Sequence, residues 1–508
     1  MKKYNNWNGN IISDIKIETP EKNEYIIDII RKCKEERKKV RVVGSGHTMA
    51  PFIAHNKESD IFLISLEKYD LEPSNFVLDK DKMEVTVNAG MKLSELYNEL
   101  SKYRLFLDTQ PASTVFTVGG LINMPVHGGR LGASILSDSV KSLSFIDDNG
   151  IINNVKEGDK NFNLYRMGLG MFGIIISVTF KVYKIESLTV IRNTANNLFY
   201  LDKNKYKLDR KLVHNRFCSI VKKCIDNNEL KQYHHSFMDF HNNKLLSIDW
   251  TESKNPSHFM NIKEATKIID FPPNDFVNKT LLPNYRTYPF YLKTMGSLAR
   301  NAIKLFVDLN QLDDQDMFWF FMSSKVYYLG YFIPIYTEGD DLEDINALNN
   351  LYKSLETVMN KVHYSINNKK SFNIDLPMDI RFVVSNNSCP LSPIYKKGKK
   401  VVYAAVDLIT GASNINLNYQ QKQGSYKKLN KHFRQFYSNV ENEWKKLGGV
   451  PHYAKMFGFA PPTKYNQNGK KSYPFTYVND LFQFIEKEEI AYKSSSIFRS
   501  DFIENLLY

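Results

Sequence analysis

The segment of residues 41–48 has the composition of a turn that holds a phosphate. A short predicted strand at residues 39–43 leads directly into Gly44-Ser45-Gly46-His47, where small residues permit a tight bend. Exposed backbone N–H groups in such a bend can point at a pyrophosphate, although glycine turns are also common as purely structural elements. The segment lacks the patterns of the nucleoside triphosphatase loop and of the Rossmann fingerprint. Its candidate ligand contacts are Val43, Gly44, Ser45, Gly46, His47 and Thr48.

Two further glycine segments follow, at residues 118–129 and 167–173. Glycine beside a strand often marks a place where the backbone approaches a flat ligand closely. Three such turns in one region indicate a shared cause, and a dinucleotide surrounded by main-chain amides would supply it. The candidate contacts in these segments and in the strand that follows are Gly119, Gly120, Val126, His127, Gly128, Gly170, Gly173 and Ile175.

Polar residues that could act on a substrate occur much later in the chain. Asp379 and Arg381 are two positions apart on a predicted strand, so their side chains share one face and can reach one ligand. A surface ion pair is the alternative, and it would contribute little to stability. His452 has an ordinary pKa near neutrality, which suits proton transfer, but it could equally be a hydrogen-bonded wall of a site.

The elements that must position these residues are visible in the apolar pattern of the first 185 residues. Residues 19–21 indicate the start of an amphipathic helix, whose apolar positions run from Tyr25 to Cys33. A second amphipathic helix is predicted at residues 93–100. Strands are predicted at residues 39–43, 61–66, 83–88 and 174–182.

The pattern changes near residue 186, where glycine turns become fewer and longer strands alternate with helices. Among these strands we predict residues 379–385 and 400–408. A chain of 508 residues also exceeds what one hydrophobic core usually serves. We therefore predict an α+β protein of two domains, at residues 11–185 and 186–508.

Composition places the chain among ordinary globular proteins. Hydrophobic residues make up 43% and charged residues 24%, which is outside the range of disordered proteins. The net charge of +13 favours anionic ligands such as phosphate groups. This charge is spread thinly and forms no helix-long basic stripe of the kind that nucleic-acid binders show.

The cysteines indicate neither a disulfide framework nor a zinc site. Cys33, Cys218, Cys224 and Cys389 are few for the length of the chain, and we expect them to be buried small hydrophobes. The N-terminus has no apolar run of signal-peptide length, and no later run of eighteen apolar residues follows. We expect a soluble, intracellular protein of the cytoplasm, with no transmembrane segment and no metal site.

The N-terminal region resembles the FAD-linked oxidases of the vanillyl-alcohol oxidase type, and among them the sugar-1,4-lactone (aldonolactone or gulonolactone) and alditol oxidases. Residues 44–48 are similar to that family's G-S-G-H-S turn, whose histidine bonds covalently to the 8α-methyl group of FAD. Residues 118–143 resemble its T-H-G turn and the strand that follows, and residues 168–178 resemble its G-L-G-x-x-G closing strand. The resemblance implies a covalent FAD on His47.

Two later segments resemble motifs of the lactone oxidases. Residues 378–383 are similar to the family's E-x-R-F motif, and residues 448–455 to its G-G-x-P-H-W-A-K motif. The resemblance implies that Lys455 and Arg381 supply positive charge beside the flavin and that Asp379 orients a substrate hydroxyl. These residues and His452 are the candidate catalytic residues.

The resemblance implies an N-terminal FAD-binding domain of two subdomains, called the PCMH type, and a sheet-and-helix substrate (cap) domain whose C-terminal segment returns to the flavin. The expected reaction is oxidation of a sugar lactone, or of a related sugar or alditol, with oxygen as acceptor and hydrogen peroxide as product. Val126 would lie near the flavin edge where oxygen arrives. Two alternatives stay open: a dehydrogenase that uses a quinone or cytochrome acceptor, and a flavin-fold structural protein that packages nucleic acid.

Four positions depart from the family pattern. Asp379 stands where the family has Glu, Tyr453 where it has Trp, and Arg130 and Ser134 where glycine is usual. The shorter carboxylate could face a different hydroxyl, and the Tyr453 hydroxyl needs a partner. The loop after His127 is expected to take a different course. No cysteine lies within residues 119–129, so the second flavin bond of some relatives is not expected.

Overall fold

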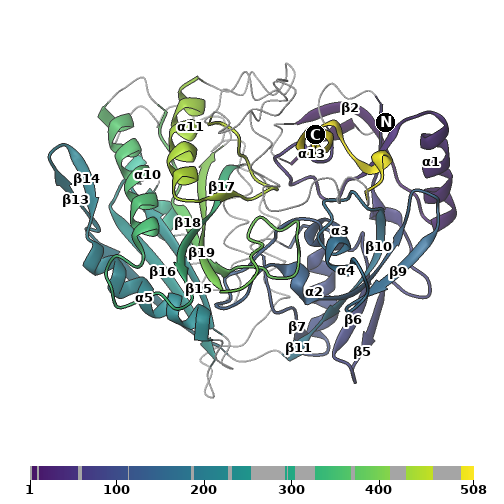
Figure 1. The fold of residues 1–508 in the computed structure, drawn as a ribbon, viewed down its shortest axis with the longest axis horizontal. Coiled ribbons are helices and arrows are strands. Elements are labelled where there is room, and N and C mark those ends of the chain that lie inside the picture. The colour runs from purple at the N-terminus through teal and green to yellow at the C-terminus, as the bar shows by residue number, and fades with distance from the viewer. Residues whose placement is uncertain are drawn as a thin grey trace.

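The computed structural model describes residues 3–7, 11–54, 60–111, 114–184, 188–226, 232–252, 292–294, 296–301, 303, 326–367, 372–411, 431–460 and 494–507. The N-terminal region forms two sheets with their helices, and the later part of the chain forms one larger sheet covered by helices (Figure 1). The predicted α+β fold class is confirmed. The boundary predicted near residue 185 falls at residues 185–187, outside the described residues, and the division into two domains stays a prediction.

The first sheet of the N-terminal region has four strands. β2 and β3 both run parallel to β4, and β1 runs antiparallel to β2. Helix α1 (Asn23–Glu35) begins later than the predicted start at residues 19–21. β2 pairs with β4 as far as Glu18, and the Glu21 carbonyl accepts from the Asp70 amide at 3.0 Å and not from a helical amide. In spatial order the strands are β1 (Lys3–Asn5), β2 (Ile12–Glu18), β4 (Ile61–Ile64) and β3 (Lys39–Val42).

The second sheet is antiparallel and has five strands, of which β10 is the central one. β10 is apolar, and only its last residue is exposed. Three helices accompany it: α2 (Leu93–Ser101), α3 (Val118–Ile122) and α4 (Phe162–Tyr165). A short pair of strands, β7 (Leu105–Phe106) and β11 (Tyr183–Lys184), lies beside the sheet. In spatial order the strands of the sheet are β5 (Phe76–Asp79), β6 (Glu84–Asn88), β10 (Ile174–Lys181), β8 (Val140–Ile146) and β9 (Ile152–Lys156).

The large sheet has seven strands. Helices α5 (Arg210–Asp226), α10 (Asn349–Asn367) and α11 (Lys431–Lys446) cover the face that points away from the N-terminal region (Figure 1). A hairpin of β13 (Phe199–Asp202) and β14 (Lys205–Leu208) lies beside α10. In spatial order the strands are β12 (Leu188–Asn196), β16 (Lys244–Glu252), β15 (Gln232–Asp239), β18 (Met378–Val384), β19 (Val401–Gly411), β17 (Val326–Thr337) and β20 (Val450–Pro451).

The four strands at the centre of the large sheet are buried along most of their length, because helices cover one face and the N-terminal region lies over the other. Asp379 on β18 pairs with Asp407 on β19, and Asp407 in turn pairs with Gly330 on β17. Residues that pair directly across strands lie on the same face of a sheet. Two carboxylates and a glycine therefore lie in a row across three neighbouring strands.

The last described segment of the chain returns to the N-terminal region. It contains a 3-10 turn, η7 (Ser496–Phe498), and helix α13 (Asp501–Leu507), drawn in yellow in Figure 1. Lys39 forms an ion pair with Asp501 at 2.7 Å, and the Arg41 guanidinium donates to the carbonyl of Phe498. The chain end is thereby attached to β3, the strand that enters the first glycine turn.

The predicted elements differ from the structure mainly at their ends. The strand predicted to end at residue 66 ends at Ile64, since Leu66 opens a 3-10 turn, η1 (Leu66–Lys68). The strand predicted at residues 400–408 continues to Gly411 in its pairing with β17. Three of the four cysteines are buried as expected. Cys218 is only half-buried, and its thiol lies 3.6 Å from the carbonyl of Leu342, so that part of the prediction is wrong.

Candidate functional site

One cavity lies between the N-terminal region and the inner face of the large sheet. All the predicted site residues except Gly128 line it. Gly128 instead packs against the backbone of Gln110, where an added Cβ would lie 2.5 Å from the carbonyl oxygen. The structure thus brings together residues that are separated by more than 400 positions in the chain.

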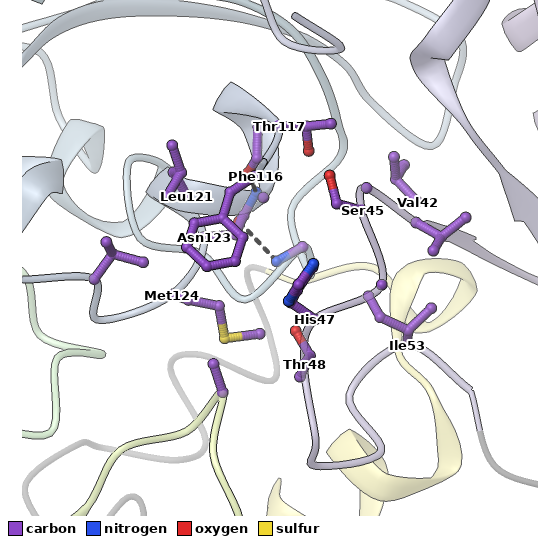
Figure 2. Close-up of a pocket in the computed structure, with 18 of the residues that line it drawn as sticks. Val42, Ser45, His47, Thr48, Ile53, Phe116, Thr117, Leu121, Asn123 and Met124 are labelled. Atoms are coloured by element: carbon purple, nitrogen blue, oxygen red, sulfur yellow. Dashed lines mark hydrogen bonds between the residues drawn. The ribbon is translucent and has the colours of Figure 1, made fainter. Parts of the chain in front are cut away.

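The first glycine turn forms one wall of the cavity. β3 ends at Val42, and the Val43 amide donates to the Ile64 carbonyl at 2.8 Å before the chain bends. Gly46 has φ +71°, a backbone conformation that favours glycine. A Cβ at Gly44 would lie 2.2 Å from the Thr117 hydroxyl oxygen, so the turn can approach α3 only without a side chain there. Figure 2 shows Ser45 and Thr117 on the two sides of this approach.

The third glycine segment closes the cavity from the side of β10. Gly170 donates its N–H to the Asn123 amide oxygen at 2.9 Å, which joins this segment to the end of α3. The buried Arg41 guanidinium donates to the carbonyls of Gly170 at 2.7 Å and of Leu169 at 2.8 Å. The side chains of Asn123 and Arg41 therefore attach the other two glycine segments to the main chain of the third.

His47 points into the cavity between two aromatic rings. Its imidazole stacks on Trp7 with ring centroids 4.9 Å apart and an interplanar angle of 15°. The Phe116 ring meets it edge-on at 5.0 Å, as Figure 2 shows from one side of the cavity. Within the described part of the chain no hydrogen bond reaches the His47 ring. Burial lowers the pKa of His47 to about 3, so the imidazole is neutral at neutral pH.

Asp379 and Arg381 lie on the opposite wall, on the inner face of β18. Both side chains are buried, at 2% and 3% exposure, and the Arg381 Nη2 lies 3.5 Å from the Asp379 Oδ2. His235 on β15 is fully buried beside them and contacts the Asp379 carboxylate through its Nε2. Burial acts to raise the pKa of Asp379, but His235 and Arg381 outweigh it, so that this pKa lies below its ordinary value.

Lys455 forms the second charged pair of the cavity, with Asp407 on β19. Its ammonium group also lies 5.9 Å from the centre of the Tyr328 ring. Burial raises the pKa of Asp407, although the lysine opposes this shift. Gly330 lies directly beneath the pair, since a Cβ there would be 2.3 Å from the Lys455 Cδ and 2.6 Å from the Asp407 Oδ1.

The segment that carries Lys455 begins with the edge strand β20 and runs along its neighbour β17. His452 donates its N–H to the Gly330 carbonyl at 2.9 Å, and Met456 donates to the Tyr328 carbonyl at 2.8 Å. On its other side, the Met49 amide donates to the Ala454 carbonyl at 2.8 Å. Met49 lies two residues after His47, so a main-chain hydrogen bond connects the His47 turn directly with the Lys455 segment.

His127 and His452 meet at the boundary between the two walls. Their ring centroids are 5.7 Å apart, and Phe332 stacks on His452 at 5.5 Å. Burial and the charges of Lys455 and Arg381 hold the pKa of His127 well below its ordinary value. Burial, Lys455 and His127 lower the pKa of His452 likewise. Of the two alternatives for His452, the hydrogen-bonded wall fits the structure better, because the pKa is lowered and the ring Nδ1 accepts from the Ala454 amide at 3.2 Å.

Of the four departures from the family pattern, Asp379 lines the cavity, whereas Tyr453, Arg130 and Ser134 lie around it. Tyr453 is buried against Phe52, at a centroid distance of 6.1 Å. Arg130 forms an ion pair with Asp108, and its backbone bridges to Tyr233 of β15. The loop after His127 is thereby hydrogen-bonded to the large sheet. Ser134 lies in the same loop, next to Ala133, whose carbonyl accepts from the Val384 amide at 3.0 Å.

Several residues of the cavity were not predicted from the sequence. They are Trp7, Phe116, Asn123, His235, Tyr328 and Asp407, of which all but His235 line the cavity itself. Asp407 could have been predicted from the sequence. In the strand predicted at residues 400–408, it is the one charged residue that follows Lys400 among apolar neighbours. The others carry no motif, and only the order of the strands brings them to the site.

Comparison with known proteins identifies the N-terminal part of this site. Residues 16–156 match the FAD binding domain family, and the chain therefore carries an FAD-binding domain. With respect to fold, the structure resembles a cholesterol oxidase of Brevibacterium sterolicum, with a TM-score of 0.72, 14% identity and coverage of 100% of this chain and 96% of that one. At this identity the likeness shows the shared fold alone.

Relatives of similar sequence include two kinds of lactone enzyme. The L-gulonolactone oxidase of Mus musculus is 28% identical over 42% of this chain and 49% of its own length. The mitochondrial L-galactono-1,4-lactone dehydrogenase of Arabidopsis thaliana is 27% identical over 40% of this chain and 32% of its own. The L-gulono-1,4-lactone dehydrogenase of Mycobacterium tuberculosis is 28% identical over 36% and 42%. The matches thus span about half the length of these relatives, or less.

Among the helices that the structure describes, none is both long enough and apolar enough to span a bilayer. In the same parts of the chain, no group of three or more His, Cys, Asp or Glu side chains is arranged to hold a metal ion.

Proposed function

We propose that this protein oxidises a sugar lactone, or a closely related sugar or alditol, with FAD bound covalently through His47. The observation that carries the proposal is the single cavity in which the His47 turn of the FAD-binding domain meets Asp379, Arg381 and Lys455. The hydrogen bond between Met49 and Ala454 connects the two halves of this site. The relatives named for lactone oxidation support the choice of substrate.

The residues present fit an FAD. Glycine residues bring the bare main chain to the cavity at Gly44, Gly119 and Gly120. The Gly119 N–H donates to the Ala89 carbonyl at 2.8 Å, so the N–H groups that can approach a pyrophosphate here are those of Gly44 and Gly120. Val43, Ser45, Gly46 and Thr48 would hold the cofactor together with these glycines, and Gly170, Gly173 and Ile175 would hold it from the opposite side. Val126 and His127 would form the wall between the cofactor and the large sheet.

The His47 imidazole is suited to a covalent bond. A neutral ring keeps a lone pair on one nitrogen, and the low pKa of His47 means that this form prevails at neutral pH. No described hydrogen-bond partner competes for that lone pair. His47 is therefore proposed as the attachment point, as its position in the G-S-G-H-T turn implies.

The charged residues of the sheet face suit a neutral polyol. When bound, FAD accepts a hydride from a carbinol carbon and passes two electrons to an acceptor. Lys455 and Arg381 place positive charge where an alkoxide and a reduced flavin ring would be stabilised. Asp379, held ionised by His235 and Arg381, can accept a hydrogen bond from a substrate hydroxyl. Since Arg381 and Lys455 each have a carboxylate partner, the sheet face favours an uncharged lactone over a free sugar acid.

Oxygen is the proposed acceptor, with hydrogen peroxide as product, because the first relatives compared are named oxidases. A dehydrogenase that passes electrons to a quinone or cytochrome is the second candidate, favoured by the relatives that carry that name. We also propose a cytosolic location, which the four free cysteines support, since a reducing compartment keeps thiols free.

The test begins with the visible spectrum of the purified protein before and after acid precipitation. A yellow pellet and a mass increased by one FAD are expected, and His47→Ala should release the flavin into the supernatant. Anaerobic mixing with sugar lactones, alditols and free aldonic acids should bleach the flavin with the lactones fastest. Peroxide formation compared with dye reduction then separates the two acceptors. If no sugar, lactone or alditol reduces the flavin, the proposed reaction is refuted.

A further inference from the structure

We propose that Trp7 is a positioning residue that holds the His47 imidazole in the orientation required for attachment of the flavin. This inference rests on the proposed covalent linkage and adds to it a residue from outside the glycine turn. Trp7 belongs to the N-terminal segment that contains β1 and lies ahead of the matched FAD-binding domain at residues 16–156.

The His47 ring depends on aromatic packing for its orientation. A histidine side chain rotates about two bonds, and a hydrogen bond to one ring nitrogen usually selects one arrangement. His47 has no such bond within the described residues. Trp7 covers one face of the ring, nearly parallel to it, while Phe116 touches it with an edge at 82°. The face contact with Trp7 therefore restricts the rotation of the ring most directly.

The backbone around Trp7 is fixed to the same turn. The Trp7 amide donates to the Gly46 carbonyl at 2.8 Å, and the Asn6 side chain donates to the Thr48 carbonyl at 3.1 Å. These two hydrogen bonds fix the backbone of the residues immediately before and after His47. Asn6 is itself held, since its side-chain oxygen accepts from the Ile11 amide at 2.9 Å and the residue is 1% exposed. The stacking partner is thus positioned independently of any bound ligand.

The attachment needs a defined orientation because one particular nitrogen must reach one carbon. A bond forms between an imidazole nitrogen and the carbon of the C8 methyl group, while a methyl C–H bond and the imidazole N–H bond break. The two electrons and two protons released reduce the flavin ring, and dioxygen or another electron acceptor reoxidises it afterwards. Orientation of this kind changes the rate of bond formation more than the affinity for the ligand.

The experiment compares two replacements of similar size at position 7. Trp7→Phe keeps an aromatic face, whereas Trp7→Leu keeps apolar volume without one. Tyr103→Leu is the matched control, since Tyr103 stacks on Phe76 at 6.3 Å and 9° in the same region but lies outside the cavity. Flavin-free full-length protein is mixed with FAD, and total bound flavin and acid-stable flavin are followed over time.

We expect Trp7→Leu to bind FAD normally but to attach it about three- to tenfold more slowly, as the strength of an aromatic pair implies. Trp7→Phe and Tyr103→Leu should attach it at close to the unchanged rate. Equal rates for Trp7→Leu and Trp7→Phe would overturn the proposal. So would a loss of total flavin binding in Trp7→Leu with normal attachment of what remains bound, because Trp7 would then act in binding and not in orientation.

An independent readout uses the flavin-free protein alone. Stacking on an indole shifts the ring-proton NMR signals of a histidine upfield, and Trp7→Leu should remove that shift from His47. The absence of an upfield shift in the unchanged protein would refute the stacking itself. Release of all flavin from the unchanged protein by acid would instead refute the covalent linkage, which distinguishes the failure of the proposed function from the failure of this inference.

Discussion

Gly330 offers a sharp test of how the site positions its lysine. In Gly330→Ala the new Cβ would lie 2.3 Å from the Lys455 Cδ and 2.6 Å from the Asp407 Oδ1. Since carbon atoms pack at about 3.5 Å, the lysine side chain must move by about 1 Å. Its ammonium group is held by Asp407 and lies over Tyr328, so the shift separates it from one of these partners.

The expected effect is larger on the reaction than on stability. A displacement of about 1 Å in a group that acts on the substrate can lower the rate by about 100-fold. Overpacking at a buried position destabilises a protein by about 1–3 kcal/mol. The assay is stopped-flow reduction of the flavin by a lactone under anaerobic conditions, together with thermal unfolding of the same samples.

Gly398→Ala provides the matched control. Gly398 has φ +92° and no atom within 4 Å of an added Cβ, so alanine introduces backbone strain without contact. The strain should cost about 1–2 kcal/mol of stability and leave the rate of flavin reduction unchanged. An unchanged rate in Gly330→Ala would refute the reasoning, as would an equal loss of rate in both variants.

Two further predictions concern pH. In His235→Gln the pKa of Asp379 should rise, because the effect of burial is then opposed mainly by Arg381. The acid limb of the pH profile for flavin reduction should therefore move to higher pH. A profile that stays in place would contradict the role of His235. His452 is neutral in the folded protein and has a pKa well below 6.5, so it contributes stability that is present above pH 6.5 and is lost as the pH falls below it. Between pH 6.5 and about pH 5, the stability of His452→Gln measured by denaturant unfolding should therefore depend less steeply on pH, by up to about 1.4 kcal/mol per pH unit at the acid end of this range. An identical dependence would argue against a neutral His452.

Local sequence determined the pieces of the site that depend on short-range geometry. The bend from β3 into His47 needs residues without bulky side chains, and the glycines at positions 44 and 46 make this need visible in the sequence. Gly44 lies against Thr117, and Gly46 has a positive φ angle. The alternation of a strand places Asp379 and Arg381 on one face whatever lies around them. The family motifs added the covalent histidine and Lys455, which remain proposals for this chain.

Helix and strand ends were less well determined, because tertiary pairing decides where extended backbone stops. The residues at 19–21 are favourable for a helix start, yet β2 pairs with β4 as far as Glu18 and the helix begins only at Asn23. In the same way β19 extends to Gly411 because β17 offers partners along that length. Local propensity is a weak signal when neighbouring strands supply hydrogen bonds.

Only the tertiary structure decided the electrostatics of the site. His235 reaches Asp379 because β15 lies beside β18, and Asp407 reaches Lys455 because β17 and β19 are neighbours, orders that no spacing in the chain encodes. The sequence left His452 open as a proton-transfer group or as a wall of the site, and burial beside Lys455 and His127, which lowers its pKa, favours the wall. The free energy of a charge depends on the dielectric and the charges around it in space, whereas residue type and spacing specify only what a side chain could do.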